Sequence, residues 1–379
     1  MAFLRRLGHH NFKIILIILA LVLLWFYRLR SPPNKPANFA KLNQNKLMSQ
    51  SQREENNNLK KQGQREVHNL RDMFTIENCQ CARSKKDIAK LRNIPRNFFD
   101  SKSESTCSDL ATLRGPGQKV VSYSYYLIDG LCETSRDRHF EVFLGQLHGT
   151  ITSMKKYYPG WVVRIYHNVT VHDAMSSDEL CRIYCDHDNV DLCHVYDLPV
   201  LGNLADKGVV GRFWRFSVMG DPTVEVFMSR DTDSWVLERE AMAVKEWLSS
   251  GVTYHLMHDH PKHRPVIMSG LWGAFNKDQE YLQQVRDFMF EWRVSDKPSH
   301  DNEMLRILVW PIMKDDVLNH DSFTCNDPNH GPNVPFPTRR EGNKYCGWGL
   351  SKTDPALDVE ETECPVECRP DDHKDWISC

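Results

Sequence analysis

One stretch of this chain, residues 224–233, limits the possible folds more than any other. It reads Val-Glu-Val-Phe-Met-Ser-Arg-Asp-Thr-Asp, an apolar alternating run that ends on Asp231 and Asp233. Such a run predicts a strand that enters a buried sheet. Because extended residues two apart point the same way, we expect the two carboxylates to lie within reach of one hard cation. A solvated turn or a helix cap is the competing interpretation of the tripeptide alone.

The segments around this strand predict an α/β fold. Other strand-like runs lie at 120–127, 161–166, 190–196, 253–257 and 266–268. Helical spacing is found at 139–158, 177–184, 211–218, 238–249, 278–292 and 302–309. Strands that alternate with helices predict a mostly parallel sheet, in which ligands bind beyond the carboxyl ends of the strands. Asp231 and Asp233 stand at such an end.

An uncharged apolar run at 14–27 predicts a membrane segment. It is short for a thick bilayer, but basic flanking residues that reach the interface would fit it to a thin one. A cleaved signal peptide is the alternative. Trp25, Phe26 and Tyr27 stand where cleavage needs small residues, which favours an uncleaved signal anchor at 14–30 behind a cytoplasmic tail at 1–13. Basic residues on both sides leave the orientation undecided by charge.

The cysteines decide the orientation better. All 12 follow the apolar run, which favours disulfides in an oxidising lumen. The sequon at Asn168 agrees with a lumenal body. Zinc is the alternative, although Cys181/Cys185 and Cys364/Cys368 offer only loose ligand spacings. We expect most cysteines to be paired, and the last five to fix the C-terminal lobe: Cys325, Cys346, Cys364, Cys368 and Cys379.

Composition divides the rest of the chain. Residues 31–75 are polar and proline-containing, which predicts a disordered stem. A cysteine-containing segment at 76–117 leads into an α/β body at 118–325, and a cysteine-rich lobe follows at 326–379. The 48 Lys and Arg nearly balance the 50 Asp and Glu. This balance argues against nucleic acid or an acidic membrane surface as the main partner.

Four motifs carry a resemblance to a known family. They are the Asp231–Asp233 tripeptide after its strand, a basic-aromatic helix at 207–216, the Gly-Leu-Trp-Gly at 270–273, and the segment 300–305. With the anchor and the stem, they resemble the Golgi type II glycosyltransferases of the GT-A fold, a Rossmann-related α/β architecture. The resemblance covers 118–325. Segment 300–305 resembles the Asp-Gln-x-x-Leu of that family, with Asn302 in place of Gln.

The resemblance also implies residue roles. A divalent metal would be held by Asp231, Asp233 and His320. Nucleobase and ribose would be contacted by Ser122, Tyr123 and Tyr126, and phosphates or the sugar by Lys207, Arg212 and Arg215. Gly270 and Trp272 would lie beside the nucleotide sugar, and the catalytic residues would be Arg212 and Asp301, the latter on the donor sugar or as a general base. Strand packing, solvated helix charges and a structural histidine remain the competing interpretations of these residues.

The implied function is a metal-dependent transfer of a sugar from a nucleotide sugar to a glycan or glycoprotein. A UDP-sugar is the expected donor and Mn²⁺, or else Mg²⁺, the expected metal, because the departing diphosphate needs its charge stabilised. The protein would be a single-pass type II protein of the Golgi membrane. Two other classes remain open: a non-catalytic, membrane-anchored carbohydrate-binding ectodomain and a metal-dependent lumenal hydrolase.

Overall fold

The computed structural model describes residues 72–95, 103–128, 130–291, 299–325, 327, 333–349 and 362–379. By its internal contacts the chain divides into Met1–Gly63 and Gln64–Cys379, and all described residues belong to the second unit. The predicted tail, anchor and stem up to residue 71 therefore lie outside the described residues. Within these ranges, no helix combines the length and the apolar character needed to cross a bilayer.

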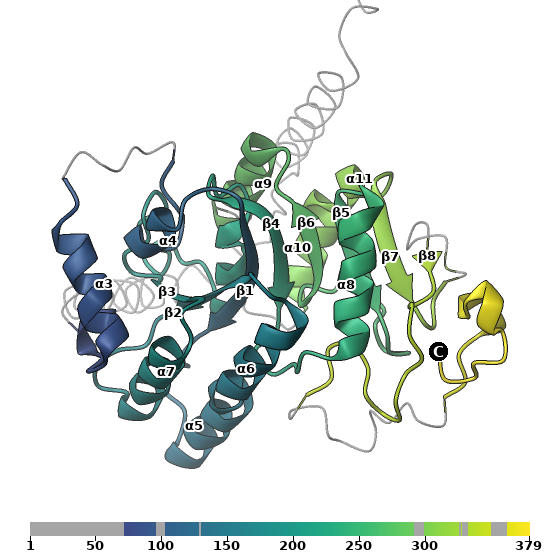
Figure 1. Cartoon of the computed structure of the whole chain (residues 1–379), viewed down its shortest axis with the longest axis horizontal. Coiled ribbons are helices and arrows are strands. Elements are labelled where there is room, and N and C mark those ends of the chain that lie inside the picture. Colours follow the sequence, from purple (N-terminus) through teal and green to yellow (C-terminus); the bar gives the residue numbers. More distant parts are fainter. Residues whose placement is uncertain are drawn as a thin grey trace, which may run out of the picture. The chain divides into compact units, whose positions relative to one another are not determined.

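An eight-stranded sheet forms the centre of this unit (Figure 1), in the order β3-β2-β1-β4-β6-β5-β7-β8. The strands are β1 (Gln118–Tyr125), β2 (Val162–His167), β3 (Val190–His194), β4 (Val224–Arg230), β5 (Tyr254–His258), β6 (Leu271–Phe275), β7 (Val317–Asp321) and β8 (Asn333–Val334). Five neighbouring pairs are parallel, and β6 runs antiparallel to β4 and β5. The prediction of a mostly parallel α/β sheet is confirmed.

Helices cover both faces of the sheet. They are α3 (Ala82–Arg92), α4 (Asp109–Leu113), α5 (Glu133–Phe140), α6 (Leu147–Tyr157), α7 (Ala174–Asp186), α8 (Glu238–Ser250), α9 (Gln279–Glu291), α10 (His300–Leu308) and α11 (Trp310–Met313). The short helices are η1 (Ile76–Asn78), η2 (Glu141–Gly145), η3 (Gly211–Val218), η7 (Val366–Cys368) and η8 (Asp371–His373), of which η2 is a π-helix and the others are 3-10 helices.

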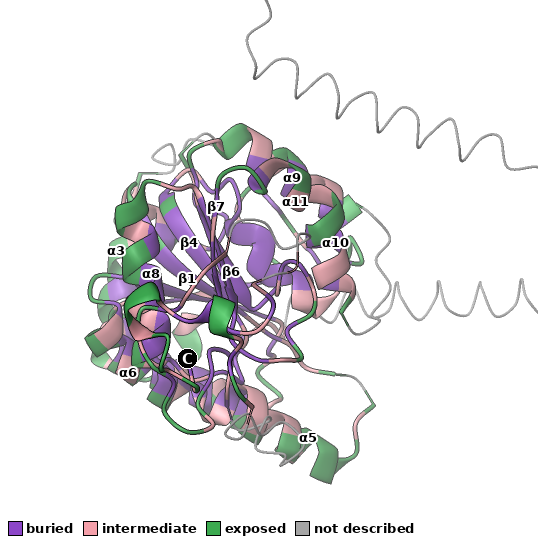
Figure 2. Ribbon diagram, turned by 90° about the vertical axis from the view of Figure 1, so that its right-hand side faces the viewer, coloured by how far each residue is buried: buried purple, intermediate pink, exposed green. Residues whose placement is uncertain are grey.

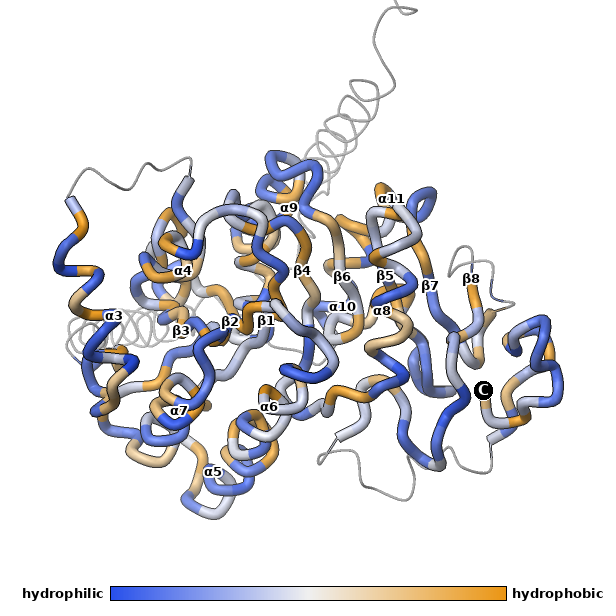
Figure 3. Tube along the Cα trace, viewed as in Figure 1, coloured by the Kyte–Doolittle hydropathy of each residue, from blue (hydrophilic) through white to orange (hydrophobic). Residues whose placement is uncertain are grey.

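Alternation along β1 divides the core into two layers. Val121, Tyr123 and Tyr125 pack with α6, α7 and α8, whereas Val120 packs with η3, α9 and α10. Figure 2 shows α6 and α8 on one side of the sheet and α9, α10 and α11 on the other. Figure 3 shows apolar residues along β4 and β6 and hydrophilic ones on the connecting loops. Period-two patterning thus places a buried sheet between two helical layers.

Two local predictions are corrected. Residues 266–268 form no strand, and the strand is β6 instead. Val266 and Ile267 are buried in a loop, and Met268 is half-buried. These residues fill the core without pairing as a strand, and the following N–H, that of Ser269, donates to a side chain, Asn302 Oδ1, at 2.8 Å. The helix predicted at 139–158 is α5, the π-helical turn η2 and α6 in succession, and it begins at Glu133.

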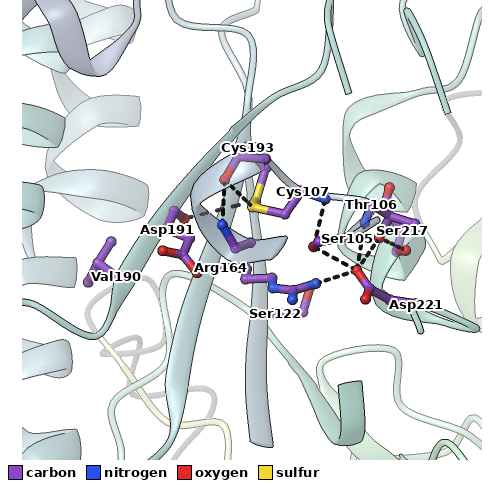
Figure 4. Close-up of a disulfide and its surroundings, with 12 residues drawn as sticks. Ser105, Thr106, Cys107, Ser122, Arg164, Val190, Asp191, Cys193, Ser217 and Asp221 are labelled. Atoms are coloured by element: carbon purple, nitrogen blue, oxygen red, sulfur yellow. Dashed lines mark hydrogen bonds and ion pairs between the residues drawn. A yellow bond between two sulfur atoms is a disulfide. The ribbon is translucent and has the colours of Figure 1, made fainter. Parts of the chain in front are cut away.

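Three disulfides tie the cysteine-containing segment at 76–117 to α7 and β3. Cys79–Cys181 and Cys81–Cys185 join it to α7, and Cys107–Cys193 joins it to β3. Figure 4 shows the last of these beside the fully buried pair of Arg164 and Asp221, whose Nη1 and Oδ2 are 2.6 Å apart. These bridges exclude the zinc alternative at Cys181 and Cys185.

The C-terminal cysteines are paired except one. Cys325–Cys368 and Cys364–Cys379 are disulfides, which excludes zinc at Cys364 and Cys368. The expectation that Cys346 is paired is wrong, because its thiol is free and buried against Ala243, Met257 and Leu271. Burial raises the pKa of this thiol well above its usual value. Because β8 pairs with β7 and Cys346 packs against residues of the core, residues 333–349 extend the main sheet and core.

Thiol titration should distinguish the two free cysteines. Unreduced, denatured protein is expected to contain two free thiols, because ten of the 12 cysteines form five bridges. Native protein should react only at exposed Cys132, since Cys346 is shielded by the core. A hydrogen bond with Ser135 also lowers the pKa of Cys132. Cys132→Ser should abolish the native reaction, and four or more thiols after denaturation would contradict this pairing.

Candidate active site

A cavity of about 270 Å³ lies beyond the carboxyl ends of β1 and β4. These strands are parallel neighbours, and the chain proceeds from β1 to β2 and β3 in one direction but places β4 on the other side. Ligands of open α/β sheets bind at such a reversal of strand order. Ser124 and Tyr126 line the cavity from the end of β1, and Asp231 and Asp233 line it from the end of β4.

The two aspartates lie in a turn and not on the strand. β4 ends at Arg230, and the Ser234 N–H donates to Asp231 O at 3.2 Å. The prediction that extended residues two apart bring the two carboxylates together is therefore wrong, because Asp231 and Asp233 do not belong to the strand. Both side chains nevertheless line the same cavity, with the Asp231 side chain 40% exposed and Asp233 buried.

Arg215 is the central cation of this cavity. Its guanidinium donates to Asp231 Oδ1 through Nη1 and to Asp301 Oδ2 through Nη2, the latter at 2.9 Å. Its side chain is only 6% exposed. Burial opposes the charge, but the two carboxylates more than compensate and raise the pKa of Arg215. Arg215 therefore joins the turn after β4 to α10 through two charge-assisted bonds.

Strand β1 fixes the position of Arg215 through two serines. Ser122 Oγ donates to Arg215 O at 2.7 Å, and the Arg215 N–H donates to Ser124 Oγ at the same distance. Ser122 and Tyr123 are buried, so neither faces the cavity. Of the three residues expected to contact nucleobase and ribose, the structure brings only Tyr126 to the cavity.

Asp301 is held by several donors. Its Oδ2 accepts from Ser269 Oγ at 2.7 Å as well as from Arg215, and its Oδ1 accepts from the Asn302 N–H at 3.1 Å. Asn302, which replaces the glutamine of the resembled motif, accepts from the Ser269 N–H. These bonds hold the Asp301 carboxylate in place to orient Arg215. A contact of Asp301 with the donor sugar, or a role as general base on the acceptor, stays a prediction.

Gly270 leaves the space that the Asp231 carboxylate occupies. A Cβ at this position would overlap both carboxylate oxygens of Asp231. Gly270→Ala is therefore expected to displace Asp231 and to weaken binding of UDP with Mn²⁺ roughly tenfold, measured by titration calorimetry. Gly149→Ala is the matched control, because a Cβ there meets nothing within 4 Å. Equal affinities in both variants would show that the position of Asp231 does not matter for binding.

The lining of the cavity carries two arginines and three aspartates, so its formal net charge is −1. A diphosphate would be repelled by this lining unless a cation came with it. Mg²⁺ and similar ions are commonly held to nucleotides by one or two carboxylates, and phosphate oxygens complete the shell. Asp231 and Asp233 fit that arrangement. Among the described residues, no three His, Cys, Asp or Glu side chains gather as a metal site.

Several predicted site residues lie elsewhere. Lys207 Nζ donates to Leu201 O at 2.7 Å, and Trp272 is fully buried beneath η3 and β4. His320 on β7 is also buried, with Nδ1 2.9 Å from His255 Nε2 and Nε2 3.3 Å from Glu246 Oε2. None of these three lines the cavity. Arg212 does line it.

Sequence reasoning missed part of the lining. The structure adds Ser124, Phe143, Thr232, Ser269 and Ser299. Phe143 belongs to the π-helical turn η2, a rare geometry that is frequent at functional sites. Ser299 has a positive φ of 64° at the start of α10. Of these five residues, only Ser269 could have been predicted from the sequence, because it directly precedes the Gly-Leu-Trp-Gly motif at 270–273.

A second cavity, of about 490 Å³, lies at the β3 edge of the sheet. It is bordered by the N-terminal segment and α4, with His167 and His194 at its inner wall. Burial lowers the pKa of both histidines. Although it is larger, its lining among the described residues carries the carboxylates of Glu104, Asp109, Asp191 and Asp197 but no arginine or lysine to face a diphosphate. The cavity at β1 and β4 combines both kinds of charge and is therefore the candidate active site.

Comparison with solved structures finds distant similarity to two transferases. A glycosyltransferase involved in the glycosylation of the major capsid of PBCV-1 matches with TM-score 0.32 and 14% identity over 57% of this chain and 90% of that one. The 4-diphosphocytidyl-2C-methyl-D-erythritol synthase of Anaerococcus prevotii DSM 20548 matches with TM-score 0.30 and 13% identity over 56% and 90%. No protein-family model and no curated protein sequence matches the chain. Similarity at TM-scores this low establishes no function for the chain.

Proposed function

We propose that this chain is a metal-dependent GT-A glycosyltransferase that moves a sugar from a UDP-sugar to a glycan or glycoprotein acceptor. The observation that carries the proposal is the common cavity of Asp231, Asp233 and Arg215 at the strand-order reversal between β1 and β4. The net negative lining suits a divalent cation, Mn²⁺ or Mg²⁺, together with a diphosphate.

The chain's own residues divide the work. Asp231 and Asp233 hold the ion, which when bound supplies positive charge to the departing diphosphate. Arg215 and Arg212 add positive charge on the same cavity wall. Tyr126, packed edge-to-face on Trp214 at 5.9 Å, and Phe143 offer aromatic surface for the nucleobase.

The reaction exchanges one bond at the anomeric carbon. An acceptor hydroxyl oxygen bonds to that carbon while the bond from carbon to diphosphate oxygen breaks. The nucleoside diphosphate leaves with the electron pair, and the hydroxyl proton passes to a basic oxygen in the site. The electrostatic task of the protein is therefore concentrated on the leaving group, where the metal-binding aspartates and Arg215 lie.

We also propose that the body acts in the secretory pathway, as the lumenal part of a type II Golgi membrane protein. Five disulfides support an oxidising compartment. The apolar run at 14–27 is the proposed anchor. At the Asn168 sequon, Oδ1 accepts from the Leu127 N–H at 2.7 Å, and Nδ2, the atom that would carry a glycan, donates to Leu127 O at 3.5 Å. A glycan there would therefore have to be added before folding.

A panel of nucleotide sugars tests the function. We expect the full chain to release UDP from one UDP-sugar when Mn²⁺ is present, and EDTA to stop the release. A protein that retains glycans but releases no nucleotide from any donor is a carbohydrate-binding ectodomain. Metal-dependent cleavage of simple phosphate esters without sugar transfer identifies a hydrolase. Either of these results overturns the proposal.

A further inference from the structure

Two tryptophans form a pair beside the turn that carries Asp231 and Asp233. Trp235 follows Asp233 by two positions, and Trp348 comes from the C-terminal part of the chain. Their ring centroids are 4.6 Å apart, with the planes at 81°. Both side chains are half-buried. We call this pair, Trp235 and Trp348, the indole platform.

Backbone contacts fix the platform next to the metal-binding turn. The Trp235 N–H donates to Trp348 O at 2.9 Å, and Ser234 Oγ donates to Gly347 O at 3.2 Å. A Cβ at Gly349 would overlap the Asp233 carbonyl oxygen. Gly347 has φ +89°, which a side chain would strain. The segment Gly-Trp-Gly is thus packed directly against the turn, and glycine is needed on both sides of Trp348.

The orientation of Trp235 is also fixed. Its Nε1–H donates to Gln146 Oε1 at 2.5 Å, and Gln146 Nε2 in turn donates to Val142 O. Gln146 follows the π-helical turn whose Phe143 lines the cavity. Because Nε1 of Trp235 is hydrogen-bonded within the protein, the part of this indole ring that solvent can reach is hydrocarbon. That surface is held rigid, without the rotamer entropy that binding would otherwise cost.

A pyranose ring is the ligand that suits such a surface. One face of a pyranose presents several C–H groups, and the negative face of an aromatic ring attracts them, while the sugar hydroxyls point outward to water. Tyr126 and Phe143 already supply aromatic surface inside the cavity for a nucleobase. The platform lies outside that lining but adjoins the turn of Asp233. An acceptor must lie beside the anomeric carbon of the donor, which is bonded to the diphosphate that Asp231 and Asp233 would hold through the metal.

We propose that the acceptor of this protein is an existing glycan, and that its terminal pyranose stacks on Trp235 and Trp348. The inference rests on the proposed function and adds a class of substrate to it. The protein would extend a sugar chain, and would not attach a first sugar to a bare serine, threonine or asparagine. Trp235 and Trp348 are specificity-determining residues in this account, because they hold the acceptor and take no part in releasing the nucleotide.

A glycan array tests the platform directly. The full chain, labelled and supplied with MnCl₂ and UDP, is incubated with immobilised glycans and with unglycosylated Ser, Thr and Asn peptides. Wild type is expected to retain pyranose-terminated glycans, and Trp235→Ala or Trp348→Ala to weaken retention roughly tenfold or more. Trp376→Ala is the matched control, since Trp376 is also half-buried and stacked on an aromatic ring, His373, at 4.1 Å.

Acceptor-independent release of UDP from the donor, measured in the same variants, separates this inference from the proposed function. We expect all variants to release UDP at the wild-type rate, while transfer by the platform variants shows a raised acceptor KM. If Trp348→Ala fails to fold, Trp348→Leu keeps apolar bulk without the π face and should show the same loss. Equal glycan retention in wild type and folded platform variants, or transfer to bare peptides only, overturns the inference. Absence of UDP release in wild type overturns the proposed function instead.

Discussion

Asp231→Asn and Asp233→Asn are expected to abolish most of the metal-dependent turnover while leaving the unfolding temperature near that of the wild type. Each substitution keeps the size and most of the hydrogen bonding of the side chain but removes a charge that a divalent cation needs. Loss of one electrostatic contact to a developing charge commonly costs roughly 100- to 1000-fold in rate. Folding should survive because each Asn has the size of the Asp that it replaces. At position 231 the side chain is also partly exposed, and Asn can still accept from Arg215.

The measurement pairs thermal unfolding with UDP release in the presence of Mn²⁺. Glu225→Gln is the matched control, because it removes a carboxylate from the exposed side of the same strand, β4. It should change neither unfolding nor turnover. Unchanged turnover in both aspartate variants would remove the central residues of the proposed function.

Arg215→Met is expected to destabilise the protein by roughly 3–5 kcal/mol, the range found when one member of a buried ion pair is removed. The loss arises mainly at Asp301, whose side chain is 8% exposed and would remain charged in a buried place. Asp231 is more exposed, so water would compensate for part of its lost partner. The unfolding temperature should fall by on the order of 10 °C.

Arg306→Met provides the contrast within the same helix as Asp301. Arg306 pairs with Glu303, and their side chains are 53% and 46% exposed. An exposed pair of this kind is worth about 0–1 kcal/mol, so the variant should unfold close to the wild type. Equal destabilisation by the two substitutions would show that the bonds from Arg215 to Asp231 and Asp301 add nothing particular to the fold.

Much of the fold follows from local pattern. The alternation in 224–230 predicts β4, and helix α8 follows from its amphipathic spacing, because each pattern records which side of an element is buried. The failures occur where burial does not imply pairing. Val266 and Ile267 are as apolar as a strand but fill a loop, and Cys346 fills the core beside β6 as a free thiol.

By itself, the sequence determined the α/β class, the aspartate pair at the end of a buried strand and the dense cysteine pairing. Only the tertiary structure decided which charged groups meet. Arg215, Asp231 and Asp301 lie far apart in sequence and meet because β4 adjoins β1 and α10 packs over the same face. The register of β7 on β5 likewise pairs His320 with Met257 and brings its ring to His255, outside the cavity lining. Periodicity reports the burial of a residue, whereas the partner of a buried polar group depends on strand order and register, which are long-range properties of the fold.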